Sequence, residues 1–375
     1  MATHLFVPQF QVDECLEQIR ECLEKGWTGL GFKTVEFEKA WSDYTALPHS
    51  HFLSSNTVGL HLAMYMFKTK YGWNDTDEVI TTPLTFVSTN HAILYCNLRP
   101  VFADVDDYLC LDPEDIERKI TPKTRAVIFV GIGGNCGQYR RVVDLCRTKG
   151  ICLILDAAHM AGTRIAGKHV GSESDCAVFS FQAVKNLPTA DSGMICFRDG
   201  NDDTRARKLT WLGISKDTYS RSTMPGPYKW MYDVEEVGFK YHGNSIMAAI
   251  GLVQLRHLDR GNAYRRQLAS WYEGLLADIA GCKIVPASAE CESSRHLFQI
   301  LINNRDELMS ALHERDIYPG VHYRDNTDYR MYAYASGSCP KAHRASSQLL
   351  SLPMHLGLTI ADVSAVAAVV RGCAT

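Results

Sequence analysis

The sequence predicts an α/β fold in which helices sandwich a mostly parallel mixed sheet, followed by a smaller C-terminal α+β unit. Three observations lead to this prediction. Short, continuously apolar runs recur through the middle of the chain, helix-length amphipathic segments separate them, and shorter strand and helix patterns follow near the C-terminus. Because a strand that is apolar along its whole length is buried on both faces, helices are expected on each side of the sheet.

Five apolar runs are the expected strands of the sheet, and in chain order they are Glu78–Thr82, Pro100–Asp104, Arg125–Val130, Ile151–Leu155 and Cys176–Ser180. Each run is rich in β-branched or aromatic residues, which favour strands. Residues Tyr139–Lys149 form an expected helix, and Gly131–Gly137 before it is expected to be a tight turn. The glycines of that turn miss the Gly-x-Gly-x-x-Gly spacing of a dinucleotide-binding fold, because Cys136 occupies the last position.

Two long helical patterns follow, Asn244–Leu258 and Ala263–Leu276, in which apolar residues recur three or four positions apart. The remaining expected elements are the strands Gly281–Val285 and Leu297–Ile302, a helix near Asp306–Glu314 and a final helix from Ile360. We therefore expect a large α/β domain over residues 1–260 and a smaller α+β domain over residues 261–375.

The composition favours a small ligand over a polymer. The chain of 375 residues has 39 Lys+Arg against 42 Asp+Glu, a formal net charge of −3, and without a basic run it offers no surface for nucleic acid. Its apolar stretches are far shorter than the roughly 20 residues of a membrane span, and its first residues do not resemble a signal peptide. The 13 cysteines stand singly, which indicates reduced thiols and no metal site. We expect a cytoplasmic protein that binds neither nucleic acid nor membrane.

The ends of two neighbouring strands carry the candidate chemistry. The run that ends at Asp156 places a carboxylate at the carboxyl edge of a parallel sheet, where open α/β folds bind ligands, although a helix N-cap is an equally good interpretation. The next strand ends at Ser180, and Lys185 follows five residues later. A lone loop lysine is normally a solvated charge, but this one follows a hydroxyl and an acidic strand end.

Pyridoxal phosphate needs this combination of groups. Its aldehyde forms a Schiff base with a lysine, its ring nitrogen pairs with a carboxylate, and its phosphate takes hydroxyls and backbone N–H groups. Lys185, Asp156 and Ser180 supply the three kinds of group. Residues Ser54–Gly59 precede an apolar helix whose N-terminus could hold the phosphate, and Phe86 could lie on the ring. For these two features, an ordinary helix cap and a core phenylalanine are the alternatives.

Segments along nearly the whole chain resemble the DegT/DnrJ/EryC1/StrS sugar aminotransferases, which are fold type I pyridoxal phosphate enzymes. The matching segments, in the order of the family, are Gly26–Gly29 with Glu36–Glu38, Ser55–Thr57, Asp77–Ile80 with Thr85–Phe86, Pro100–Asp106, Asp156–His159, Phe179–Phe181 with Lys185, Gly238–Asn244 running into Ala248–Gly251, and Leu350–Pro353. After the lysine the family usually reads Gly-Glu-Gly-Gly, whereas this chain reads Ala190-Asp191-Ser192-Gly193.

The resemblance implies a role for each matching residue. Lys185 is the expected catalytic residue, and the expected cofactor contacts are Asp156 at the ring nitrogen, Phe86 on the ring, His159 near it, and Asn56, Thr57 and Ser180 at the phosphate. A satisfied core histidine is the alternative for His159. Lys240 stands where the family often has an asparagine that reaches the partner subunit's phosphate, and we expect it to contact phosphate or substrate there. The expected substrate contacts are Thr28, Lys216, Tyr228, His322 and Tyr323.

The resemblance also implies a ping-pong transamination by a homodimer with shared active sites. The amino donor is expected to be L-glutamate, pyridoxamine phosphate the intermediate form of the cofactor, and the acceptor a nucleotide-linked keto sugar that yields an amino sugar for surface polysaccharide or secondary metabolite synthesis. A free keto sugar, sugar acid or cyclitol is an alternative acceptor. The alternative functions are a pyridoxamine-dependent sugar dehydratase, which carries histidine in place of the lysine, a non-catalytic regulator, and a Rossmann dehydrogenase.

Overall fold

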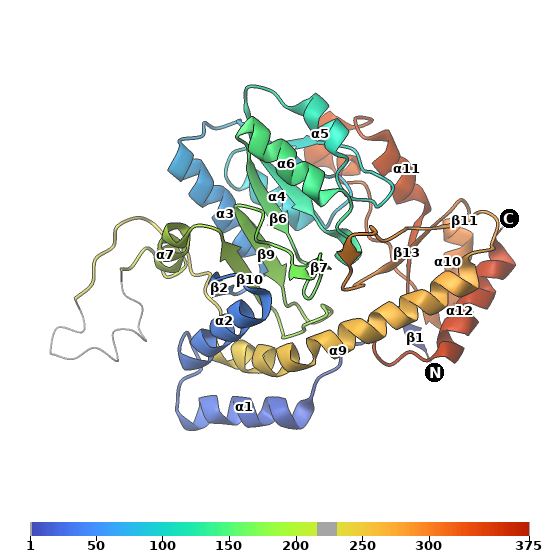
Figure 1. Cartoon of the computed structure of the whole chain (residues 1–375), viewed down its shortest axis with the longest axis horizontal. Coiled ribbons are helices and arrows are strands. Elements are labelled where there is room, and N and C mark those ends of the chain that lie inside the picture. The colour runs from blue at the N-terminus through green and yellow to red at the C-terminus, as the bar shows by residue number, and fades with distance from the viewer. Residues whose placement is uncertain (1, 216–230, 375) are drawn as a thin grey trace.

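A seven-stranded sheet organises the larger part of the chain in this computed structural model, which describes residues 2–215 and 231–374 (Figure 1). The spatial order of its strands is β2 (His49–Leu53), β10 (Gly193–Phe197), β9 (Cys176–Ser180), β6 (Cys152–Asp156), β5 (Thr124–Val130), β3 (Glu78–Thr81) and β4 (Arg99–Phe102). β10 runs antiparallel to both of its neighbours, and the other neighbouring pairs are parallel. The structure thus confirms the predicted mostly parallel mixed sheet.

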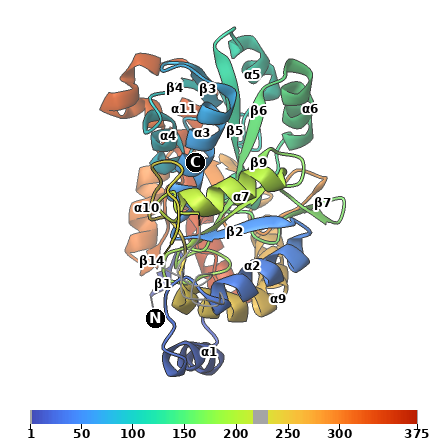
Figure 2. The same cartoon turned by 90° about the vertical axis from the view of Figure 1, so that its left-hand side faces the viewer.

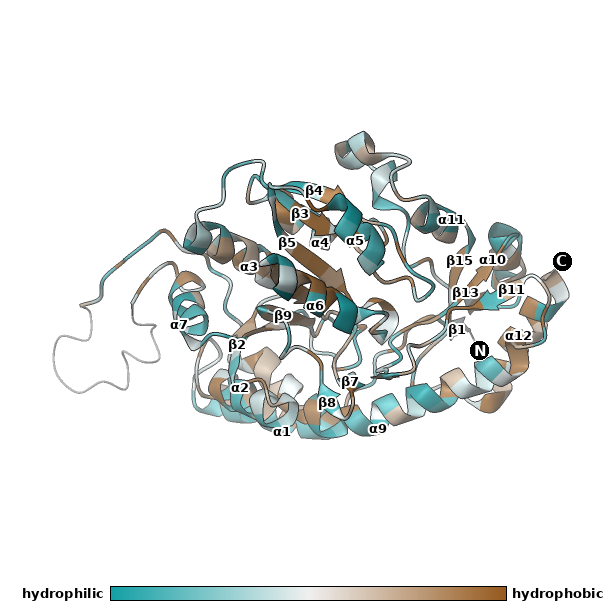
Figure 3. Ribbon diagram, turned by 45° about the horizontal axis from the view of Figure 1, so that its top comes forward, coloured by the Kyte–Doolittle hydropathy of each residue, from teal (hydrophilic) through white to brown (hydrophobic). Residues whose placement is uncertain are grey.

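Helices cover both faces of this sheet, as the continuously apolar strands require (Figure 2). On β5, Val127 and Phe129 enter one core whereas Ala126 and Ile128 enter the other, because successive side chains of a strand point to opposite faces. The helices of the first core are α2 (Phe32–Thr45), α5 (Pro113–Lys119), α6 (Tyr139–Lys149), part of α9 (Ser245–Leu276) and α11 (Pro340–Gln348). Those of the second core are α3 (Asn56–Tyr71), α4 (Val87–Leu94) and α7 (Gly200–Leu209). Coloured by hydropathy, the central strands are brown and the outer helices largely teal (Figure 3).

One long helix joins the two parts of the chain. α9 runs without a break from Ser245 to Leu276, where the sequence predicted two separate helices. The polar stretch between those patterns stays helical because its side chains have partners on the large part. The side chain of Asn262 donates to the carbonyl of Ala161 at 2.9 Å, and Asp259 pairs with Arg164 at 3.2 Å. The expected domain boundary between residues 260 and 261 therefore falls inside α9.

The C-terminal unit is built on a three-stranded antiparallel sheet with its own core. Its strands are β11 (Cys282–Ile284), β13 (Phe298–Ile302) and β15 (Leu349–Leu352), and its helices are α10 (Arg305–His313), α11 (Pro340–Gln348) and α12 (Ile360–Cys373). The start of the chain joins this unit, because β1 (Thr3–His4) runs parallel to β14 (Ile317–Tyr318). The predicted strands and helices of this region are confirmed to within one or two residues.

The remaining described elements are α1 (Val12–Glu24), β7 (Arg164–Ile165), β8 (Lys168–His169), β12 (Cys291–Glu292) and the short 3₁₀ turns η1 (Ile132–Gly134), η2 (Asn326–Asp328) and η3 (Arg330–Ala335). η1 lies in the expected glycine turn, and Gly133 and Gly134 there adopt the left-handed φ angles of 63° and 87°. Over residues 2–215 and 231–374, no helix combines the length and the apolar character that crossing a bilayer requires.

A single glycine lets the N-terminus of α3 approach the sheet. A Cβ atom on Gly193, the first residue of β10, would lie 2.7 Å from the backbone nitrogen of Asn56 and 2.7 Å from the carbonyl oxygen of Phe179. Both neighbours are backbone atoms, which cannot yield as a flexible side chain can. Gly193 therefore fixes how closely the first turn of α3 packs against β9 and β10.

We expect Gly193→Ala to lower the free energy of unfolding by about 1–3 kcal/mol, because the added methyl group must displace backbone. Gly274→Ala is the matched control, since Gly274 lies exposed in α9, where a Cβ atom would meet nothing beyond the helix backbone within 4 Å. That variant should be stabilised by about 0.5–1 kcal/mol through helix propensity. Urea unfolding measures both changes, and equal stability of the two variants would contradict this account of the packing.

Candidate active site

The loops at the carboxyl edge of the parallel strands enclose a cavity of about 700 Å³. The predicted site residues that line it are Asn56, Thr57, Phe86, Asp156, His159, Ser180, Lys185, His322 and Tyr323. They come from the start of α3, the segment between β3 and α4, the ends of β6 and β9, and a segment of the C-terminal unit. The structure thus brings together residues that lie up to 267 positions apart, Asn56 and Tyr323.

Two of the other predicted contacts, Thr28 and Lys240, lie elsewhere. Thr28 is exposed before α2, and its carbonyl oxygen accepts a hydrogen bond from the backbone of Ser245. Lys240 is also exposed, with its Nζ atom 3.1 Å from the centre of the Trp211 ring. Neither side chain lines the cavity of its own chain. Lys216 and Tyr228 fall outside the described residues.

Asp156 is a buried carboxylate, 3% exposed, at the last position of β6. One oxygen accepts a hydrogen bond from the Thr89 hydroxyl at 2.7 Å, and the other accepts from the amide of Ala158 at 3.2 Å and from the side chain of Asn56 at 3.4 Å. Burial raises the pKa of Asp156, and these hydrogen bonds together with the charge of Lys185 oppose that rise. Because all three donors are neutral, the carboxylate is suited to a further, cationic partner in the cavity.

Lys185 lies half-buried in the loop after β9, where its amide donates to the carbonyl of Gln182 at 2.8 Å. Burial lowers the pKa of its ammonium group from 10.5 to about 8, although the carboxylate of Asp156 opposes this shift. Near pH 8 a large fraction of the molecules therefore carry a neutral amine at this position. A neutral lysine amine is a nucleophile that can attack a carbonyl carbon.

The first turn of α3 faces the same cavity. α3 begins at Asn56, and the hydroxyl of the N-cap residue Ser55 accepts from the amide of Val58 at 3.3 Å. The other first-turn N–H groups have no partner within the helix, and the helix dipole favours an anion beside them. Ser180 adds a hydroxyl from the end of β9. This arrangement fits a phosphate group.

His159 and Tyr323 form a hydrogen-bonded pair on one wall of the cavity. The amide of Gly133 donates to Nδ1 of His159 at 3.1 Å, so the ring proton resides on Nε2. Nε2 lies 3.2 Å from the Tyr323 hydroxyl and can donate to it. Burial and the charge of Lys185 hold the pKa of His159 well below its ordinary value. His159 is therefore a neutral donor that faces the cavity.

Phe86 is 59% exposed at the rim of the cavity, which excludes the alternative of a core phenylalanine. Its ring centre lies 6.1 Å from that of Tyr323 at an interplanar angle of 52°. The open ring face is available to a flat ligand, since stacked rings bury apolar surface and align their quadrupoles.

Thr89 and His296 are two of the cavity residues that the sequence did not predict. Thr89 lies on α4 and donates a hydrogen bond to Asp156. Its position three residues after Phe86 predicts that both side chains lie on the same side of a helix, and this spacing is a sequence signal for Thr89. The ring of His296 lies 4.3 Å from that of His159, and its Nδ1 atom donates to the side-chain oxygen of Asn186 at 3.0 Å. A histidine that directly precedes a buried strand has no feature in the sequence that separates it from an ordinary core residue.

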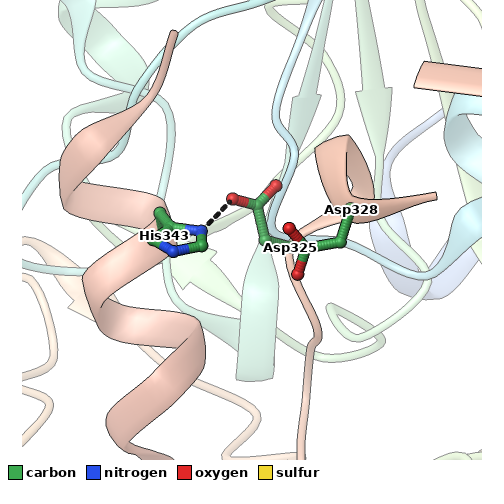
Figure 4. A group of neighbouring side chains, drawn as sticks. All are labelled: Asp325, Asp328 and His343. Carbon is green, nitrogen blue, oxygen red and sulfur yellow. Dashed lines mark hydrogen bonds and ion pairs between the residues drawn. The ribbon is translucent and has the colours of Figure 1, made fainter. Parts of the chain in front are cut away.

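Asp325, Asp328 and His343 form a group of potential metal ligands in the described part of the chain (Figure 4). One oxygen of Asp325 already accepts from the backbone and the hydroxyl of Thr327, at 2.8 and 2.7 Å, and the other faces His343 Nδ1 at 3.2 Å. Asp325 is the N-cap of η2. The group therefore has a structural role as the cap of this turn.

Comparisons with known proteins agree with this geometry. The model of the DegT/DnrJ/EryC1/StrS aminotransferase family matches residues 10–371. The aminotransferase TlmJ from Streptoalloteichus hindustanus is 32% identical, with a TM-score of 0.90 over 99% of this chain and 98% of that one. The sugar aminotransferase CalS13 from Micromonospora echinospora is 28% identical, with a TM-score of 0.90 over 98% and 99%. The PMP form of Spr1654 from Streptococcus pneumoniae is 25% identical, with a TM-score of 0.89 over 98% of each chain.

The lowered pKa of Lys185 predicts a measurable effect on stability in the protein stripped of cofactor. Between pH 8 and pH 10.5 the unfolded chain binds more protons at this position than the folded protein. The effect of Lys185 on the free energy of unfolding therefore becomes more favourable as the pH rises, and the destabilisation caused by burying its charged form is largest below pH 8. We expect Lys185→Met to be more stable than the parent by about 1–3 kcal/mol at pH 7, with the difference shrinking towards pH 10.

Chemical denaturation at pH 7 and pH 10 measures this difference. Lys168→Met, a change at an exposed lysine of β8, is the matched control and should not reproduce the pH dependence. A Lys185→Met variant no more stable than the parent at pH 7, or a difference that grows with pH, would contradict the lowered pKa of the Lys185 amine.

Proposed function

The chain belongs to the DegT/DnrJ/EryC1/StrS aminotransferase family, whose members are pyridoxal-phosphate-dependent sugar aminotransferases, and on that basis we propose that it transfers the amino group of L-glutamate to a nucleotide-linked keto sugar. One observation carries the proposal. A lysine with a lowered pKa and a buried carboxylate with only neutral donors face the same cavity. The product of the proposed reaction is an amino sugar.

The residues of the cavity fit pyridoxal phosphate. Lys185 would hold the aldehyde carbon, Asp156 would pair with the ring nitrogen, and Phe86 would lie against the ring. The first turn of α3 and the Ser180 hydroxyl would bind the phosphate. When bound, the cofactor supplies an electron sink that stabilises a carbanion at the α-carbon of an amino acid.

The side chains of the cavity then have separate tasks. The neutral amine of Lys185 would take a proton from the α-carbon of the amino donor and deliver it to the former aldehyde carbon of the cofactor, because burial keeps its pKa near the working pH. Asp156 would keep a negative charge at the ring nitrogen, because Thr89, Asn56 and Ala158 hold both of its oxygens. The Tyr323 hydroxyl, which accepts from Nε2 of His159, would donate its own proton to a carboxylate or hydroxyl of the substrate.

The preference for a nucleotide-linked acceptor rests on the mouth of the cavity. Arg324 lines it with a side chain that is 61% exposed, and its guanidinium lies over the ring of Tyr329 at 5.2 Å. A guanidinium beside an aromatic ring suits a pyrophosphate next to a sugar or base. Lys216 and Tyr228 stay predicted substrate contacts, since they lie outside the described residues.

We also propose a homodimer in which Lys240 reaches the cofactor site of the partner subunit. Lys240 and nearby Met231, Val234 and Val237 are exposed, the last of them at 85%. Exposed apolar side chains are typical of an interface, and two-fold symmetry would bring Lys240 of each copy to the site of the other. All 13 cysteines are free thiols, which supports the proposed cytoplasmic location.

The reaction can be tested in two halves. The protein loaded with pyridoxal phosphate should be yellow, and L-glutamate should bleach it as the amino group moves to the cofactor. A nucleotide-linked keto sugar should then restore the colour, whereas the matching free keto sugar should do so at least about tenfold more slowly, since it lacks the pyrophosphate contacts. We expect Lys185→Ala to bind the cofactor but to lose turnover.

Absorbance in the near ultraviolet and visible range follows both halves. Turnover by Lys185→Ala at the parent rate would contradict the proposed role of Lys185. A parent protein that binds the cofactor but never bleaches with an amino donor would instead favour a non-catalytic regulator.

A further inference from the structure

Two cysteine sulfurs lie in contact outside the cofactor cavity. The thiol of Cys136 donates a hydrogen bond to the sulfur of Cys291, with 2.8 Å between the two Sγ atoms. Cys136 lies two residues after η1, whereas Cys291 begins β12, 155 positions later. A disulfide has an S–S length of about 2.05 Å, so a shift of less than about 1 Å between these sulfurs reaches bonding distance.

The two sulfurs lie where residues 133–136 of the large part contact residues 286–296, the segment that leads into the C-terminal unit; we call this contact the seam. The side chain of Asn135 donates to the carbonyl of Pro286 at 2.8 Å and accepts from the amide of Ser288 at 3.1 Å. The carbonyl of Gly133 accepts from the amide of His296 at 3.0 Å. Hydrogen bonds on both sides of the thiol pair therefore hold its two backbones in register.

The seam also supports the wall of the active site. The carbonyl of Gly134 accepts from the Cys291 thiol at 3.6 Å. The neighbouring Gly133 amide donates to His159, and the Ser294 hydroxyl donates to the His159 carbonyl at 2.6 Å. A covalent bond across the seam would tie this wall of the cavity to β12.

We propose that Cys136 and Cys291 are an oxidation site that closes to a disulfide when the protein meets a peroxide. Cys291 is the more exposed partner, since Cys136 is 1% exposed. Hydrogen peroxide oxidises the Cys291 thiol to a sulfenic acid and releases one water. The sulfur of Cys136 then displaces the hydroxyl group as a second water, so that two thiols and one peroxide give one disulfide and two waters.

The pair differs from the other thiols nearby. Cys110 belongs to the same region, but its thiol donates to the carbonyl of Asn135 at 3.9 Å and is 1% exposed. Cys282 on β11 is partly exposed, as Cys291 is, but no hydrogen bond to another cysteine thiol is found for it among the described residues. Proximity of a second thiol therefore selects Cys291 over another partly exposed cysteine.

The test uses the full chain loaded with pyridoxal phosphate, treated with hydrogen peroxide, alkylated and digested for peptide mass mapping. We expect one cross-linked species that joins the peptides of Cys136 and Cys291, about 2 Da lighter than the two thiol peptides together, and its loss on adding dithiothreitol. Cys291→Ser should remove the cross-link, whereas Cys282→Ser should retain it. The cross-link in the unsubstituted protein can be mapped even if one of the cysteine variants fails to fold.

Recovery of both cysteines as alkylated peptides after peroxide treatment would overturn the proposal, and so would a cross-link that uses Cys110. The readout is a mass and not a reaction rate. Its result is therefore independent of whether the proposed transamination is correct.

Discussion

The burial of the Asp156 carboxylate at the end of β6 constrains the whole site. Removing an ionised carboxylate from water costs several kcal/mol unless hydrogen bonds and a cation compensate it. Thr89 from α4, Asn56 from α3 and the backbone of Ala158 supply the hydrogen bonds, and Lys185 contributes a nearby charge. Because Asn56 also donates to the Val178 carbonyl at 2.9 Å, the residue that steadies the carboxylate also anchors the first turn of α3. The ring site and the phosphate site are therefore positioned by the same contacts.

The C-terminal unit completes the cavity from the opposite side. The side chain of Gln299 on β13 donates to the His322 carbonyl at 2.8 Å, and the His322 ring lies 3.1 Å from the Ser351 hydroxyl of β15. These contacts attach the segment that carries Tyr323 and Arg324 to the small sheet. The continuous helix α9 links that sheet to the large one. The proposed substrate contacts therefore depend on the packing of the two parts as well as on local loop structure.

Much of the fold and of the candidate site could be predicted from the sequence, because the patterns that indicate them are local. Continuous apolar runs identified the central parallel strands, and the spacing of Asp156, Ser180 and Lys185 identified the cofactor chemistry. The single helix α9 could not be predicted, because polar residues at its middle are held by Ala161 and Arg164, which lie far away in the chain. His296 was missed for the same reason, since its contacts with His159 and Asn186 are with residues that only the fold brings close.

The covalent attachment of pyridoxal phosphate to Lys185 is the central claim, and borohydride reduction followed by peptide mapping tests it most directly. Reduction fixes a lysine-linked cofactor to its residue irreversibly, and a tryptic map then identifies the modified peptide. We expect a phosphopyridoxyl group on the peptide that contains Lys185 and none on that peptide in Lys185→Ala. A label on another lysine, or an unlabelled peptide from the fully loaded protein, would contradict it.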